Sequence, residues 1–243
     1  MRRGTALPAV FGAVAAAHLA GLLAGAPAVV HATKPALMPL LAACVLARRG
    51  PRLLALALLF GCGGDTLLQI GGDTVFLLGM GSFAAGHVCY LVLFARHGAA
   101  SGRGRTYGLA AGYAVVWAGV VALLWPGLEA GLRVPVAVYS LLLTAMAYGA
   151  TRTRVPVAAG AALFLLSDTL IASGLADGWP RPPLPQFWIM LTYAGGQALL
   201  AAGLLRHIAD AGGAGPRRPG PSASGEDANG RQSRTAARAS TMP

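Results

Sequence analysis

Two aspartates stand inside long apolar runs of this sequence. Asp65 lies in FGCGGDTLL (residues 60–68), and Asp168 lies in FLLSDTLI (residues 164–171). A carboxylate in an apolar segment is costly, so an ionisable residue within a membrane-spanning helix is a functional hypothesis by default. Because the order Asp-Thr-Leu occurs at both sites, the sequence favours a role that needs two carboxylates.

Other polar side chains recur in apolar runs at helical spacing. Lys34 lies in HATKPALMP and His87 in GHVCY, where Tyr90 follows at i+3. Gln197 follows Tyr193 at i+4, which places the pair on one helix face. The remaining polar candidates are Tyr139, Ser167, His31, Gln69 and Ser140.

Two simpler roles remain open for the ionisable residues. Lys34 could form one structural ion pair with either aspartate, although the second carboxylate would still need a partner or a proton. Asp65, Asp168 and His87 could in principle ligate a metal ion. The sequence has no HExxH or similar spacing, and Lys34 would oppose a cation. We therefore expect neither a metal nor a cofactor.

The composition indicates the environment of these residues. Apolar residues make up 56% of the 243 residues and charged residues 11%, with a mean hydropathy of +0.62. Soluble domains carry about 25% charged residues, so the sequence predicts an integral membrane protein. The net charge of +11 comes from arginine clusters between apolar runs, without a basic stripe interleaved with aromatics. Nucleic-acid binding is therefore not expected, and the sequence identifies no protein partner.

Eight segments are long and apolar enough to cross a bilayer, which takes about 20 residues. Such segments are too long for barrel strands, so we predict an all-α, polytopic bundle of eight transmembrane helices. The expected helices cover residues 5–25, 28–47, 52–71, 74–95, 106–126, 131–150, 154–176 and 185–208.

The arginines predict the orientation of this bundle. When the loops are assigned alternately to the two sides of the membrane, one side also holds both termini. Every arginine except Arg133 and Arg181 falls on that side. Positive residues mark the cytoplasmic side, so both termini are predicted to be cytoplasmic. The protein is expected to be a multi-pass protein of a bacterial inner membrane, surrounded by membrane lipids.

The sequence divides into a membrane domain, residues 1–210, and a tail, residues 211–243. The tail is rich in Gly, Pro, Ser and Arg and is expected to be disordered and basic. Within the membrane domain, ALLFGCGGDTLL resembles AALFLLSDTLI. This similarity suggests two parallel four-helix halves related by an axis along the membrane normal.

The helix model predicts one polar pocket. Lys34, Asp65, Tyr139 and Asp168 fall in the outer half of the membrane. His87, Tyr193 and Gln197 fall near its middle. A pocket open toward the non-cytoplasmic leaflet would contain them all.

Ordered motifs across residues 28–208 resemble the YhhN-like family of lysoplasmalogenases. The matching stretches are TKPALMPLL, LLFGCGGDTLLQI, FLLGMGSFAAGHVCYLVLF, VYSLLLTAM, ALFLLSDTLIA and LTYAGGQALLAAGLL. The resemblance implies a membrane enzyme that hydrolyses the vinyl ether bond of lysoplasmalogens to a fatty aldehyde and a glycerophospho-base. It also implies a lysophospholipid substrate and a site built on Asp65 and Asp168. The implied surrounding residues are Lys34, His87, Tyr90, Tyr139, Ser167, Tyr193 and Gln197.

Vinyl ether cleavage needs a carboxylic acid that protonates carbon and a carboxylate that activates water, as in glycoside hydrolysis. We expect Asp168, in the drier stretch, to be the acid and Asp65 to be the ionised partner. Lys34 or His87 would hold the phosphate or polarise the leaving oxygen. Tyr139, Tyr193 and Gln197 would orient glycerol and water. A small transporter or proton-coupled carrier is the alternative, as is a hydrolase acting on another lysophospholipid.

Overall fold

The computed structural model describes residues 3–99 and 103–213 of the chain. Within these residues the fold is all-α, and eight α-helices are each long and apolar enough to cross a membrane. The sequence-based prediction of an eight-helix bundle is therefore confirmed. The helices are α1 (Arg3–Leu23), α2 (Pro27–Ala47), α3 (Arg52–Ile70), α4 (Asp73–His97), α5 (Arg103–Leu124), α6 (Ala130–Ala150), α7 (Val155–Leu175) and α8 (Pro185–Gly213).

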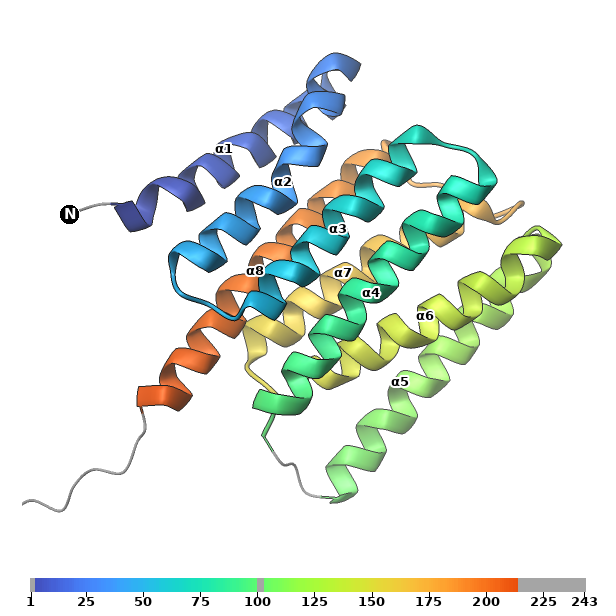
Figure 1. Cartoon of the computed structure of the whole chain (residues 1–243). Coiled ribbons are helices and arrows are strands. Elements are labelled where there is room, and N and C mark those ends of the chain that lie inside the picture. The colour runs from blue at the N-terminus through green and yellow to red at the C-terminus, as the bar shows by residue number, and fades with distance from the viewer. Residues whose placement is uncertain (1–2, 100–102, 214–243) are drawn as a thin grey trace, which may run out of the picture. The chain divides into compact units, whose positions relative to one another are not determined.

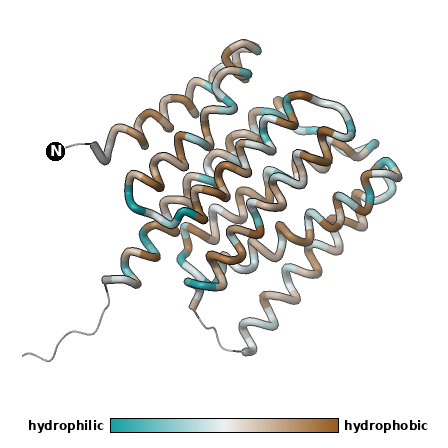
Figure 2. The backbone as a smooth tube through the Cα atoms, in the orientation of Figure 1, coloured by the Kyte–Doolittle hydropathy of each residue, from teal (hydrophilic) through white to brown (hydrophobic). Residues whose placement is uncertain are grey.

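Hydropathy follows the helices closely. Hydrophobic residues dominate the helix bodies, and hydrophilic residues gather near the helix ends (Figure 2). Arg48 and Arg49 stand at the end of α2, and Arg152 and Arg154 stand between α6 and α7. The cytoplasmic location of these ends remains a prediction.

The turn between α3 and α4 depends on two glycines. α3 ends at Ile70 because Gly71 and Gly72 adopt positive φ angles of 82° and 90°, a region that favours glycine. The chain then enters α4 at Asp73 without a longer loop. This tight connection keeps the aspartate-bearing end of α3 packed against α4.

The helices of residues 1–209 form one compact unit. α3 lies between α2 and α4, and α1 packs on α2 (Figure 1). On the other side α4 packs on α6, which also contacts α5 and α7. α5 is therefore attached to the bundle mainly through α6.

Small residues let α7 and α8 cross at backbone contact. A Cβ atom placed on Gly196 would lie 2.8 Å from the carbonyl oxygen of Gly160, and one on Gly160 would lie 2.7 Å from the oxygen of Gly196. Real Cβ contacts are longer than this, so only glycine fits at both positions.

α3 and α4 cross at the corresponding positions. A Cβ on Gly86 would lie 3.1 Å from the carbonyl oxygen of Ala57. Asp65 follows Ala57 in α3 as Asp168 follows Gly160 in α7, eight residues later in each case. The shared crossing point supports the predicted internal repeat, which nevertheless remains a prediction for the full halves.

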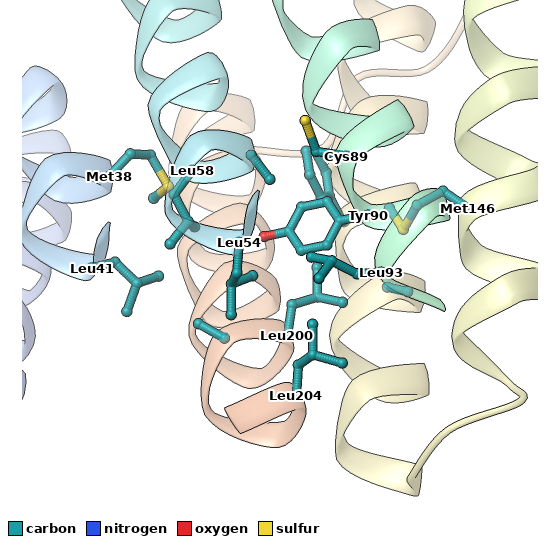
Figure 3. Packing of buried hydrophobic residues seen from close by; sticks show 14 of the residues in the cluster. Met38, Leu41, Leu54, Leu58, Cys89, Tyr90, Leu93, Met146, Leu200 and Leu204 are labelled. Atoms are coloured by element: carbon teal, nitrogen blue, oxygen red, sulfur yellow. The ribbon is translucent and has the colours of Figure 1, made fainter. Parts of the chain in front are cut away.

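A hydrophobic core fills the centre of this unit. Tyr90 is 1% exposed and lies among leucines of α3, α4 and α8, such as Leu54, Leu93 and Leu200 (Figure 3). Its ring is packed like an apolar side chain, while its hydroxyl bonds to Gln197. The core thus includes part of the polar set that the sequence identified.

The tail predicted at 211–243 lies almost wholly outside the described residues. α8 continues as far as Gly213. The division of the chain at residue 210 and the disorder of the tail therefore remain predictions.

Candidate active site

Four helices, α2, α3, α6 and α7, carry the central polar residues. Lys34 lies near the start of α2 and Asp65 near the end of α3. Tyr139 lies in the first half of α6 and Asp168 near the end of α7. Because neighbouring helices run in opposite directions, these positions fall at one end of the bundle.

A polar cavity of about 160 Å³ lies between α2, α3, α4, α7 and α8, and Tyr139 of α6 is not part of its wall. Lys34, Asp65, Ser167, Asp168 and Tyr193 all contribute to its wall. Since each water molecule takes about 30 Å³ of liquid volume, the cavity has room for several waters or for a polar part of a substrate.

Asp65 has a charged partner at this cavity. Its Oδ1 lies 3.9 Å from Nζ of Lys34. The carboxyl is buried, with Asp65 only 4% exposed, and within the described residues its Oδ2 has no hydrogen-bond partner. The Tyr193 hydroxyl interacts with Asp65 but also lacks a partner of hydrogen-bond geometry among these residues. Two buried polar atoms are therefore left for water or a ligand to satisfy.

Asp168 is held by a neutral donor instead. The Tyr139 hydroxyl donates a hydrogen bond to Oδ2 of Asp168, and Nε2 of His87 lies 3.1 Å from the same hydroxyl. Because the single Tyr139 proton points at Asp168, His87 must donate its Nε2–H to the phenol oxygen. A chain of bonds thus runs from His87 through Tyr139 to Asp168.

Three of the predicted site residues lie behind this cavity. His87 is 1% exposed and packs its ring 4.9 Å from that of Phe164, centroid to centroid. Tyr90 donates to Oε1 of Gln197 at 2.6 Å in the closed interior. None of the three belongs to the cavity wall. The expected role of His87 as a phosphate ligand does not fit this position, because α4 turns the ring toward Tyr139.

Ser167 fastens two helices beside the site. Its Oγ donates to the carbonyl oxygen of Ile189 at 3.0 Å, which joins α7 to α8 next to Asp168. The hydroxyl is therefore satisfied by the protein, although the residue also contributes to the cavity wall.

The sequence-based site set omitted one polar residue of the wall, Gln186. It lies at the start of α8, seven residues before Tyr193, and so on the same helix face. The i, i+7 spacing to Tyr193 could have identified Gln186 from the sequence as a residue of the same helix face. Gln186 was overlooked because it lies at a helix end, where a polar residue needs no special explanation.

An apolar cavity adjoins the polar one. Asp168 and Tyr139 belong to its wall, together with apolar side chains of α4, α5, α6 and α7. Asp168 therefore lies at the boundary between a polar space and an apolar one. Such a boundary suits a substrate with a polar head and a hydrocarbon chain.

The arrangement of possible metal ligands was compared with what a bound ion needs. Within residues 3–99 and 103–213, no three His, Cys, Asp or Glu side chains gather closely enough to share an ion. His87 is bonded to Tyr139 rather than directed at the two aspartates.

Comparison with known proteins identifies the family. The model of the YhhN family matches residues 29–204. Proteins named lysoplasmalogenase from Mycobacterium bovis (strain ATCC BAA-935 / AF2122/97) and Mycobacterium tuberculosis (strain CDC 1551 / Oshkosh) are each 36% identical to this chain over 184 residues. Each alignment covers 71% of this chain and 69% of the relative.

No solved structure matches this chain. The matched region contains both aspartates and every other residue of the polar set. The resemblance noted from the sequence is confirmed, and the chain belongs to the YhhN family.

Proposed function

We propose that this protein is a membrane hydrolase that cleaves the vinyl ether bond of lysoplasmalogens. The products are a fatty aldehyde and a glycerophospho-base. The observation that carries the proposal is the sharing of one polar cavity by Asp65 and Asp168. The names of its relatives agree with this activity.

Asp168 is the proposed proton donor. It lies where the polar and apolar cavities meet, so it can face the carbon of a vinyl ether whose chain extends into the apolar side. Within the described residues no cation pairs with Asp168, and the neutral Tyr139 hydroxyl donates to it. A carboxylic acid in this position transfers its proton to the carbon β to the ether oxygen, which leaves an oxocarbenium ion.

Asp65 is the proposed base. Lys34 supplies its counter-ion at 3.9 Å, so Asp65 is suited to remain a carboxylate beside the developing positive charge. It takes a proton from a water molecule in the cavity as the water oxygen bonds to the oxocarbenium carbon. In the resulting hemiacetal, Asp168 takes the hydroxyl proton as the bond from carbon to the glycerol oxygen breaks, and Asp65 gives its proton to the departing glycerol oxygen. One water is consumed, and both aspartates return to their starting forms.

The surrounding residues divide into two groups in this proposal. Lys34 and Gln186 contact the glycerophosphate end, and Tyr193 orients the attacking water. Tyr139, Ser167 and His87 position Asp168 through the bonds described above. Tyr90 and Gln197 fix the packing behind the site. No cofactor takes part.

The first test replaces each aspartate by asparagine. Purified wild type in detergent, with no gradient, should release aldehyde from a lysoplasmalogen. Asp65→Asn and Asp168→Asn should each lower the rate at least about 100-fold, because general acid and base groups contribute about 10²–10⁴ each. Aldehyde is measured by coupled oxidation.

Asp177→Asn is the matched control. Asp177 is exposed in the connection between α7 and α8, so this variant should keep full activity. Retained activity in either asparagine variant at the cavity would contradict the two-carboxylate mechanism. Wild type that binds lipid but never releases aldehyde would favour the carrier alternative instead.

A further inference from the structure

An apolar path leads from Asp168 to the membrane-facing side of α5. The apolar cavity beside Asp168 is narrow, about 70 Å³, and is bounded on one side by Val120 and Val121 of α5. A wider groove of about 340 Å³ lies against the same two valines. Leu165 and Thr169 of α7 also border both spaces. The groove and the cavity are therefore neighbours that share one wall.

The hydroxyls of Ser140, Thr144 and Thr169 along this path are already satisfied by the protein. Ser140 Oγ accepts from Trp117 Nε1 at 3.0 Å and donates to the carbonyl oxygen of Ala137. Thr144 donates to the oxygen of Ser140 at 2.7 Å, and Thr169 donates to that of Leu165 at 2.8 Å. A polar ligand would find few free partners here, so the lining favours hydrocarbon.

The end of the groove farthest from Val120 and Val121 is open. Gly108 and Gly112 border it one turn apart, and a Cβ atom at either position would meet no atom within 4 Å. Val116, which follows on the same helix row, is 59% exposed. The side of α5 that bounds the groove is thus accessible from the surrounding lipid.

The length and direction of the groove fit one lipid chain. Its α5 wall extends from Gly108 to Val121, which at 1.5 Å per residue is about 20 Å along the helix. One leaflet's hydrocarbon layer is about 15 Å thick. A chain in the groove would therefore lie parallel to its neighbours in the leaflet, with one end at Asp168.

We propose that the α5 groove and the adjoining apolar cavity form one hydrocarbon channel, which takes the chain of the substrate from the bilayer and returns the fatty aldehyde to it. This inference rests on the proposed hydrolysis of a lysoplasmalogen. It adds a chain-binding site and predicts that the channel sets the preference for chain length.

The test blocks the groove without touching the polar cavity. Gly112→Phe should lower kcat/KM for a long-chain lysoplasmalogen about 50-fold, because excluding three methylenes loses about fourfold in affinity for each. A short-chain substrate should lose less than threefold by the same reasoning. Gly119→Phe is the matched control, since Gly119 is also on α5 with open space around it but outside the groove. Gly108→Phe supplies a second obstruction one turn away.

A binding measurement separates this inference from the proposed reaction. The probe is a saturated alkyl lysophospholipid with a brominated chain, which cannot be hydrolysed at a vinyl ether. In a variant that keeps Trp117 alone, with the other tryptophans changed to Phe, the probe should quench fluorescence saturably. An excess of the unbrominated lipid should reverse the quenching, and Gly112→Phe should abolish it.

The outcomes are distinct. If wild type releases no aldehyde, the proposed function fails and the quenching arm alone decides whether the channel binds chains. If wild type is active but Gly112→Phe matches Gly119→Phe on both substrates, the channel is overturned and the function stands. An equal loss on short and long chains overturns it as well, as does quenching that the unbrominated lipid cannot reverse.

Discussion

The two aspartates of the cavity have different partners, and the difference divides their proposed roles. Asp65 has the ammonium of Lys34, whereas Asp168 has the hydroxyl of Tyr139. A cation and a phenol are not interchangeable beside a carboxyl group, because only the cation balances a full negative charge. The chain therefore presents two chemically distinct carboxyl groups to one cavity.

Two buried tyrosines give a test at this scale. Tyr90 donates to Gln197 at 2.6 Å, whereas the hydroxyl of Tyr193 has no hydrogen-bond partner among the described residues. Tyr90→Phe should lower stability by about 1–3 kcal/mol, because it leaves a buried amide oxygen unpaired. Tyr193→Phe should not lower stability but should slow aldehyde release. Denaturant unfolding in mixed micelles and the aldehyde assay measure the two effects.

A loss of stability in Tyr193→Phe equal to that in Tyr90→Phe would assign both hydroxyls to folding. Unchanged catalysis in Tyr193→Phe would remove this residue from the proposed handling of water.

Sequence reasoning found the costly residues but not all of their surroundings. Asp65 and Asp168 were identifiable because a carboxylate in an apolar run is conspicuous. The bond between Tyr90 and Gln197 was not, since it joins residues 107 apart in sequence and depends on how α4 packs on α8. The bond between His87 and Tyr139, which are 52 residues apart, was not identifiable for the same reason.

At the scale of helices, the crossing of α7 and α8 sets the position of Asp168. The backbones meet at Gly160 and Gly196. About two helical turns away, the Ser167 hydroxyl donates to the carbonyl oxygen of Ile189. Any side chain at the crossing would push the two helices apart. The cavity wall would then separate at Asp168 and Tyr193, which lie on these helices.

Adjacent glycines of α8 test this crossing. Gly196→Ala should destabilise the protein by about 1–3 kcal/mol, because its methyl group overlaps the backbone of α7. Gly195→Ala should be neutral or stabilising by up to about 1 kcal/mol, since its nearest neighbour would be 3.9 Å away and alanine favours helix. Thermal inactivation and denaturant titration report the difference. Equal effects of the two changes would show that the helices can separate freely.

The helices themselves were predictable to within a few residues. Length and continuous apolar composition define a spanning helix, and Gly71 and Gly72 mark one boundary plainly. The apolar channel beside α5 was not predictable. Its valines and leucines look the same in sequence whether they face lipid, another helix or an empty space.

At the scale of the whole molecule, the orientation in the membrane is the main prediction left to test. Both termini are predicted to be cytoplasmic from the arginines near the ends of α2, α4 and α6. A fluorescent protein fused at the C-terminus should then fluoresce. Alkaline phosphatase fused after Asp177, between α7 and α8, should be active because that connection is predicted to lie on the non-cytoplasmic side.

The control exchanges the two reporters. Alkaline phosphatase at the C-terminus should be inactive, and the fluorescent protein after Asp177 should be dark. A dark C-terminal fluorescent fusion together with an inactive phosphatase at Asp177 would reverse the orientation. The polar cavity would then open toward the cytoplasm, and the substrate would come from the inner leaflet.

The partner of each aspartate also bears on how the chain enters the membrane. A charged side chain in an isolated helix costs up to about 2.5–3.5 kcal/mol on insertion, the value at the helix centre. Asp65 on α3 pairs with Lys34 on α2, and Asp168 on α7 bonds to Tyr139 on α6. In each case the partner belongs to the helix synthesised immediately before. A translocon that holds two consecutive helices at once could therefore release each aspartate into lipid together with its Lys or Tyr partner. Each pair would form before the rest of the bundle is synthesised.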